Sequence, residues 1–185
     1  MGENVQLILK HVLQHGLQWA PGQVIVYRDR VSYTYSDMAQ RVLRLGRALQ
    51  SLGVKQGTKV GVKLPPELPS VRKYLLITDK PERPEVGWVD AEYEELLSGA
   101  TPLEELPDLD ENTVSTMSYT TGTTGRPKGV SFTQRQLTLH TLATGLALAA
   151  FGNYGGVNKY DVYMPLTPMF HAHAWGMPYV ATLFG

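Results

Sequence analysis

The stretch "TMSYTTGTTGRPKGVSFTQ", residues 116–134, contains six threonines, three glycines, one proline and one lysine. Before it, the β-branched and aromatic run "TVSTMSYT", residues 113–120, predicts a strand. After it, Thr133 followed by Gln136 forms a capping-box pattern, which predicts the start of a helix over "LTLHTLATGLALAA". The sequence therefore predicts a strand, then a loop rich in Gly and Thr, then a helix.

This loop is suited to holding an anion. Gly122, Gly125 and Gly129 let the backbone come close to a ligand and turn its N–H groups inward. Threonine hydroxyls add donors and can coordinate a hard cation such as Mg²⁺, while Lys128 adds a mobile positive charge. A solvent-exposed turn is the alternative, but strand, loop, lysine and capped helix occur in the order that phosphate binding requires. We therefore expect a phosphate-binding loop.

The spacing is not that of the common phosphate loops. A Walker loop requires G-x-x-x-x-G-K-[ST]. Here Gly122 and Gly125 are too close together, and Lys128 lies between Pro127 and Gly129. The dinucleotide pattern G-x-G-x-x-G is not met either. A P-loop-like NTPase therefore has little support, although it stays an alternative.

Composition restricts the remaining function classes. The chain of 185 residues is long enough for one domain with a buried core, and its 43% hydrophobic and 18% charged residues are typical of a folded protein. Its 17 basic side chains match its 17 acidic ones, which disfavours a general binder of nucleic acid or anionic membrane. The absence of cysteine excludes disulfides, thiolate metal sites and cysteine nucleophiles.

No signal peptide is expected at the N-terminus, and no membrane span. The longest mostly apolar run, residues 142–151, has about half of the roughly 20 residues that a spanning helix needs. We therefore expect a soluble protein. A cytoplasmic location is also expected, because a chain without cysteine fits a reducing compartment.

The rest of the chain alternates between strand and helix patterns. Before the loop, the patterns predict a helix over 5–16 ended by Gly16, a hairpin over 23–35, a helix capped by Ser36 and ended by Gly53, strands at 58–64 and 71–78, and a short helix at 90–97. After the loop, "VYMPLTPMF" (162–170) predicts a strand, and "HAHAWGMPYVATLFG" (171–185) predicts a helix. The predicted fold class is α/β.

At the loop the chain resembles a known family. "YTTGTTGRPKGV" resembles the signature loop of the adenylate-forming superfamily, which includes acyl-CoA synthetases, luciferases and peptide-synthetase adenylation domains. "MPLTPMFHAHAWGMPYVATLFG" resembles the next family motif and is most similar to fatty-acid–CoA ligases, and "SYTYSDMAQRVLRLGRALQSLGVKQGTKVGV" is similar to the family's opening hairpin, helix and strand. The resemblance implies part of the large N-terminal domain of such an enzyme, with mixed sheets flanked by helices.

The resemblance also implies a two-step reaction. A carboxylate attacks the α-phosphorus of ATP to give an acyl-adenylate and pyrophosphate, and the thiol of coenzyme A then displaces AMP. The implied partners are a fatty acid, ATP, coenzyme A and Mg²⁺, and relatives often form homodimers. The residues that would surround the β- and γ-phosphates are Thr120, Thr121, Gly122, Thr123, Thr124, Gly125 and Lys128, with the Thr120 hydroxyl on the Mg²⁺ side.

The second motif supplies the other expected site residues. The resemblance places His171 beside the reacting carboxylate and α-phosphate, Ala172 along the nucleotide site and Trp175 near the acyl channel. His171 and Lys128 are the expected catalytic side chains. A hydrogen-bonded structural histidine is the alternative for His171, and a core aromatic is the alternative for Trp175. His173 is expected to be structural, because two histidines without a third ligand make a poor zinc site.

Two departures from the family pattern affect what this chain is expected to do. Lys63 and Ser70 are almost adjacent, whereas the family has a substantial stretch between the corresponding segments. The fold therefore lacks an internal segment near 63–70, either because a block is deleted or because the sequence joins segments across an omitted region. The chain also stops at Gly185, before the family's adenine-binding segment, acidic Mg²⁺ ligand, ribose-binding Asp and C-terminal domain.

The expected organisation is an incomplete N-terminal adenylation domain without a C-terminal domain. It comprises an opening hairpin, helix and strand at 1–63, a junction and acidic connection at 64–112, and a phosphate-loop and acyl-pocket segment at 113–185. The parent protein is expected to be an AMP-forming acid–thiol ligase, and the 185-residue chain alone is expected to be inactive. A non-catalytic nucleotide- or pyrophosphate-binding module is the alternative for the isolated chain.

Overall fold

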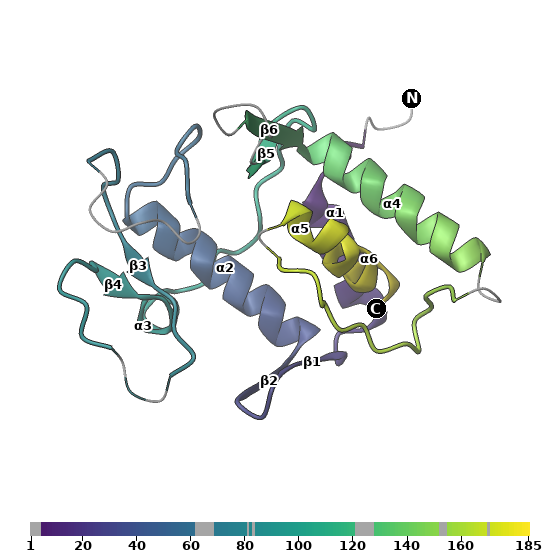
Figure 1. The fold of residues 1–185 in the computed structure, drawn as a ribbon, viewed down its shortest axis with the longest axis horizontal. Coiled ribbons are helices and arrows are strands. Elements are labelled where there is room, and N and C mark those ends of the chain that lie inside the picture. The colour runs from purple at the N-terminus through teal and green to yellow at the C-terminus, as the bar shows by residue number, and fades with distance from the viewer. Residues whose placement is uncertain are drawn as a thin grey trace. The chain divides into compact units, whose positions relative to one another are not determined.

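The computed structural model describes residues 5–61, 69–80, 82, 84–120, 128–151, 155–169 and 171–185 (Figure 1). The chain forms two compact units. One consists of Met1–Gln23 with Pro107–Gly185, and the other consists of Val24–Leu106. Each unit combines helices with small two-stranded sheets, so the predicted mixed α/β fold class is confirmed.

The second unit, Val24–Leu106, begins with the predicted hairpin. Strands β1 (Val24–Tyr27) and β2 (Val31–Thr34) pair antiparallel, with Val24 opposite Thr34. Arg28 in the turn has a positive φ of 55°. A left-handed residue is usual in a tight hairpin turn, because it matches the twist of the two strands.

Helix α2 (Tyr35–Ser51) follows the hairpin directly. Its N-cap is Thr34, so the prediction of a cap at Ser36 is wrong. Thr34 ends β2 in extended conformation, and its hydroxyl accepts a hydrogen bond from the Asp37 N–H (3.1 Å). The Asp37 carboxylate in turn accepts from the Thr34 N–H (2.9 Å), which completes a capping box. The predicted left-handed glycine after the helix is confirmed, because Gly53 has a φ of +83°.

The rest of this unit contains little regular structure. Strands β3 (Leu75–Leu76) and β4 (Ala91–Glu92) form a short parallel pair, and helix α3 (Tyr93–Ser98) follows. The strand predicted over 71–78 is therefore reduced to two residues, because its partner is only two residues long. Residues 58–61 are not in a strand, and the remainder of the strand predicted over 58–64 lies outside the described residues.

The first unit is built on three helices, α1 (Leu9–Trp19), α4 (Gln134–Ala150) and α6 (Met177–Phe184). In Figure 1, α6 (yellow) lies beside α4 (green), and both helices contact α1. Their buried faces form the core of the unit, which contains Ile8, Val12, Leu137, Thr141 and Val180. The unit also contains strands β5 (Val114–Thr120) and β6 (Lys128–Thr133) and the short turn α5 (Ala172–Trp175).

The predicted end of the first helix at Gly16 is wrong, because α1 continues to Trp19. Gly16 is buried in the helix, and a Cβ there would collide with the Thr182 carbonyl oxygen of α6. This glycine therefore allows two helices to approach closely instead of ending one of them.

Two apolar segments of this unit are less buried than their sequence suggests. Residues 162–169, predicted as part of a strand, are outside any strand of the described chain, and Val162 and Leu166 are exposed. The outer face of α4 also exposes Leu142 and Leu146. No helix in the described part of the chain is both long enough and apolar enough to cross a membrane.

Candidate active site

The glycine- and threonine-rich segment connects the two strands of a hairpin. Strands β5 and β6 pair antiparallel, with Thr120 opposite Lys128 as the last pair before the connecting segment. Thr121, Gly122, Thr123, Thr124 and Gly125 lie between these two positions, outside the described residues. The structure thus places the two ends of the predicted phosphate loop next to each other.

This arrangement corrects one prediction. The sequence predicts that the loop leads directly into a helix, but Lys128 begins strand β6, and α4 starts six positions later. The reason is that "KGVSFT" is a β-forming run, and pairing it with β5 satisfies its backbone groups.

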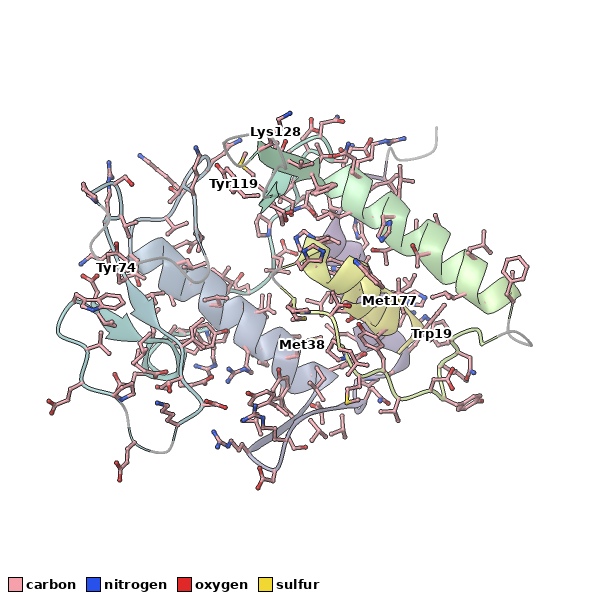
Figure 2. All side chains as sticks on the ribbon, in the orientation of Figure 1. Trp19, Met38, Tyr74, Tyr119, Lys128 and Met177 are labelled. Carbon is pink, nitrogen blue, oxygen red and sulfur yellow. The ribbon has the colours of Figure 1, made fainter. Side chains whose placement is uncertain are left out.

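Lys128 is exposed at the start of β6, and Figure 2 shows it beside the hairpin. No carboxylate forms an ion pair with Lys128 within the described chain. Its ammonium group therefore stands at the end of the loop with its charge uncompensated by the described side chains. A phosphate that approached this end would meet a cation able to move on a flexible stem.

Gly129, the next residue of β6, explains how the hairpin packs at this end. A Cβ at Gly129 would lie 3.1 Å from Met117 Sδ and 3.2 Å from Tyr119 Cε1. The Tyr119 side chain, labelled in Figure 2, therefore lies close against the β6 backbone. A Cβ at this position, opposite Tyr119, would therefore be a tight fit that the Met117 and Tyr119 side chains would have to accommodate.

Helix α4 begins at the predicted capping box, which is confirmed. The Thr133 hydroxyl accepts from the Gln136 N–H (3.2 Å), and the Gln136 side chain accepts from the Thr133 N–H (2.9 Å).

Glu111 also holds the start of α4 in place, and the sequence did not predict this contact. Glu111 accepts from the Leu7 N–H (2.8 Å) and forms an ion pair with Arg135, so it connects the start of α1 to the start of α4. Its partners are 104 and 24 positions away in sequence, which no local pattern reveals.

The second predicted motif forms a strained turn. In α5, residues Ala172, His173, Ala174 and Trp175 have positive φ values of 45°, 55°, 49° and 58°. Left-handed backbone costs roughly 1–2 kcal/mol for each residue that is not glycine. The helix predicted over 171–185 is therefore correct only from Met177, where right-handed α6 begins.

Buried Ala174 and half-buried His173 hold this turn against the rest of its unit. Ala174 is 1% exposed. The His173 ring lies between Phe132 (ring centroids 6.4 Å apart) and Tyr179 (6.0 Å), and burial lowers its pKa. His173 therefore has the contacts of a packing residue.

The three expected site residues at this turn are exposed. Trp175 is 65% exposed, so it is not a core aromatic in this structure. His171 and Ala172 are also exposed, and the His171 ring has no hydrogen-bond partner within the described chain. The structure thus leaves His171, Ala172 and Trp175 accessible along one short turn.

A group of three metal-binding side chains is not found among the described residues. The side chain of Thr120, the expected Mg²⁺-side hydroxyl, is not described. The role of Thr120 therefore stays a prediction that rests on its motif.

Comparison with known proteins identifies the family. A family model for AMP-binding enzymes matches residues 66–185, which includes the loop and the second motif. The chain belongs to the AMP-binding enzyme family. The predicted relationship to the adenylate-forming superfamily is thereby confirmed.

Relatives in the AMP-binding family include several CoA ligases. The chain is 42% identical over 93 residues to the 3-methylmercaptopropionyl-CoA ligase of Ruegeria lacuscaerulensis, covering 50% of this chain and 16% of that protein. It is 40% identical over 119 residues to the long-chain-fatty-acid–CoA ligase of Thermus thermophilus, covering 64% of this chain and 20% of that protein. The chain therefore matches about a fifth or less of the length of these relatives.

A solved structure supports the fold. The N-terminal subdomain of Klebsiella oxytoca NpsA, in complex with anthranilyl-AMSN, superposes with a TM-score of 0.66 at 20% identity, covering 96% of this chain and 52% of that one. At this identity the similarity establishes that the chain has the fold of an N-terminal subdomain in this family.

Proposed function

We propose that this chain carries the phosphate loop and part of the acyl pocket of a fatty-acid–CoA ligase. The ligase would join a fatty acid to ATP as an acyl-adenylate, release pyrophosphate, and transfer the acyl group to coenzyme A with release of AMP. The single observation that carries the proposal is the loop end of the β5–β6 hairpin, where Lys128 pairs with Thr120 and the two residues flank the family loop.

Different residues would contribute to the first step, the formation of the acyl-adenylate. As pyrophosphate leaves, negative charge grows on the phosphates, and the Lys128 ammonium would neutralise part of it. Thr120, Thr121, Gly122, Thr123, Thr124 and Gly125 would supply hydroxyl and backbone N–H donors around the β- and γ-phosphates. Mg²⁺, when bound, would add charge stabilisation at the same phosphates.

The residues at the exposed turn would bind the carboxylate substrate and the nucleotide. His171 would stand beside the carboxylate and the α-phosphate, Ala172 along the nucleotide and Trp175 at the acyl channel. Their accessibility at α5 and its N-cap residue His171 supports these roles, because a buried side chain could not meet a substrate. The division into segments 1–63, 64–112 and 113–185, the missing block near 63–70, the cytoplasmic location and the homodimer stay predictions.

A fatty acid is proposed as the substrate class for two reasons. The segment around Trp175 resembles fatty-acid–CoA ligases, and one relative is a long-chain-fatty-acid–CoA ligase. The name of another relative, a 3-methylmercaptopropionyl-CoA ligase, indicates a short sulfur-containing acid as its substrate. The test must therefore include short carboxylates as well.

The test is carboxylate-dependent exchange between ATP and pyrophosphate, measured on the protein at its natural length. Lys128→Ala should slow exchange about 100-fold, the loss typical of removing one preorganised electrostatic contact. Lys159→Ala is the matched control, because Lys159 is another lysine of the same unit and lies over the Tyr160 ring (4.9 Å). Equal exchange rates for Lys128→Ala and the wild type would overturn the role of Lys128.

The 185-residue chain provides a second measurement. It should bind pyrophosphate in a Lys128-dependent way, which calorimetry can follow. Binding to the chain together with no exchange by the natural-length protein would favour the alternative, a nucleotide- or pyrophosphate-binding module. Phosphate release without any carboxylic acid would instead favour a P-loop-like NTPase.

A further inference from the structure

His140 is not part of the family motifs quoted above, but it contacts the turn that carries two of the proposed site residues. It lies on α4, and its Nε2 is 3.0 Å from the Trp175 carbonyl oxygen. A carbonyl oxygen can only accept, so Nε2 must carry the proton of this hydrogen bond. The two residues are 35 positions apart and belong to the same unit.

The neighbouring glycine fits this contact. Gly176 has a φ of +73°, and a Cβ there would lie 2.6 Å from His140 Cδ2 and 2.8 Å from its Nε2. The imidazole therefore sits directly on the backbone at the end of the turn. Any larger residue at this position would displace the ring, so Gly176 is required both for its conformation and for the approach of His140.

The turn needs such support because its backbone is strained. Four consecutive non-glycine residues, Ala172–Trp175, are left-handed. Its own backbone bonds, Ala174 N–H to His171 O (3.0 Å) and Gly176 N–H to His173 O (3.0 Å), hold only its local shape. His140 is the side chain that hydrogen-bonds to the backbone of this turn, among the hydrogen bonds of the described residues.

We propose that His140 is the positioning residue of this turn. Its hydrogen bond to the Trp175 carbonyl holds the left-handed backbone against α4. This contact fixes the orientation of the His171 and Trp175 side chains. Strained backbone persists only where the surrounding structure holds it, and it is concentrated at functional sites. The conformational part of the proposal stands on the geometry alone, and its effect on catalysis rests on the proposed ligase function.

Removing the His140 Nε2–H donor should therefore let the backbone of the turn leave its left-handed conformation. In His140→Leu the carbonyl loses its partner while a side chain of similar bulk remains. In His140→Gln the amide N–H₂ can donate to the same carbonyl, so this conservative variant should restore the contact. Gly176→Ala should also release the turn, both because its Cβ would displace the His140 ring and because alanine disfavours the φ of +73° there.

The first readout is structural and needs no activity. Backbone NMR couplings and chemical shifts of residues 172–175 report the sign of φ, and the fluorescence of Trp175, isolated by Trp19→Phe and Trp88→Phe, reports its surroundings. We expect His140→Leu to lose the positive φ signature and to shift Trp175 emission, and His140→Gln to keep both. Retention of the positive φ values in a folded His140→Leu would overturn the proposal.

The second readout is kinetic, in the exchange assay on the natural-length protein. A displaced turn should lower kcat/KM for the carboxylate about 10- to 100-fold, since small misplacements of reacting groups cost this much. The KM for pyrophosphate, which is assigned to the hairpin, should stay unchanged, and His140→Gln should recover most of the loss. His11→Leu is the matched control, because His11 is a half-buried histidine of α1, away from the turn, whose Nδ1 lies 3.1 Å from the Oε1 of its helix neighbour Gln14.

The two readouts separate the two proposals. If the wild-type protein shows no exchange but His140→Leu releases the turn, the ligase function is wrong and the positioning role is right. If exchange is present and unaffected by a folded His140→Leu, the positioning role in catalysis is wrong. A uniform loss of thermal stability in both His140 variants, with unchanged φ and kinetics, would show a purely structural histidine.

Discussion

At the scale of single residues, His173 shows how one side chain of the motif serves packing while its neighbours stay accessible. Its ring packs between Phe132 and Tyr179, and burial lowers its pKa from the ordinary value of 6.5. His171, two positions earlier, is exposed. The structure thus separates two histidines that look equivalent in the sequence.

The lowered pKa of His173 predicts a pH dependence of stability. Because the unfolded chain binds the proton more readily than the folded one, the free energy of unfolding should fall as pH drops below 6.5. His173→Phe should remove this dependence while keeping an aromatic ring in the cluster. Chemical denaturation across this pH range checks it, with His11→Phe as the control. A His173→Phe protein with the wild-type pH slope would contradict the assignment.

At the scale of helices, two contacts connect α1 to the other helices of the first unit, and each gives a prediction. Gly16 on α1 packs against the Thr182 carbonyl of α6, and a backbone carbonyl cannot move aside as a flexible side chain can. Gly16→Ala should therefore lower the free energy of unfolding by about 1–3 kcal/mol, as overpacking usually does. Gly22→Ala is the control, because nothing lies within 4 Å of its added Cβ. Equal thermal stability of the two variants would mean that α1 and α6 are not packed this closely.

Glu111 gives the second prediction at this scale. The Leu7 N–H, followed by the Arg135 guanidinium, holds the pKa of this carboxyl below its ordinary value of 4.5. Its contribution is therefore present above that value and is lost as pH falls through the lower, folded pKa. Glu111→Gln should be less stable at neutral pH and should lose less stability on acidification. Denaturation midpoints measured from neutral to acidic pH check this, with the exposed Glu104→Gln as control.

A comparison of sequence and structure shows which elements could be predicted. The hairpin at β1–β2, strand β5, the capping box of α4 and the left-handed Gly53 depend on residues close in sequence, and all were predicted correctly. Gly16 and the segment 162–169 were misread because their outcome depends on distant partners. A glycine packed against another helix looks locally like a helix end, and a β-forming run without a partner does not become a strand.

The same distinction holds for the candidate site. The loop residues could be chosen from their motif, and the structure adds that Thr120 and Lys128 face each other across a hairpin. The left-handed turn at Ala172–Trp175 and its hydrogen bond to His140 could not be foreseen. Both result from tertiary contacts that override the local preference for a right-handed helix.

For the whole molecule, we propose that the full protein activates a fatty acid as its adenylate. Family membership covers residues 66–185, and the similarity to a solved N-terminal subdomain covers nearly the whole chain. Together they establish the family and the fold of an N-terminal subdomain. They leave the choice of acid to be measured.

The most direct measurement is ATP–pyrophosphate exchange by the natural-length protein, with a series of carboxylates from short to long chain. We expect no exchange without an acid, exchange with fatty acids, and formation of acyl-CoA once coenzyme A is added. Exchange with no carboxylate of the series, or ATP hydrolysis that proceeds equally without an acid, would contradict the claim.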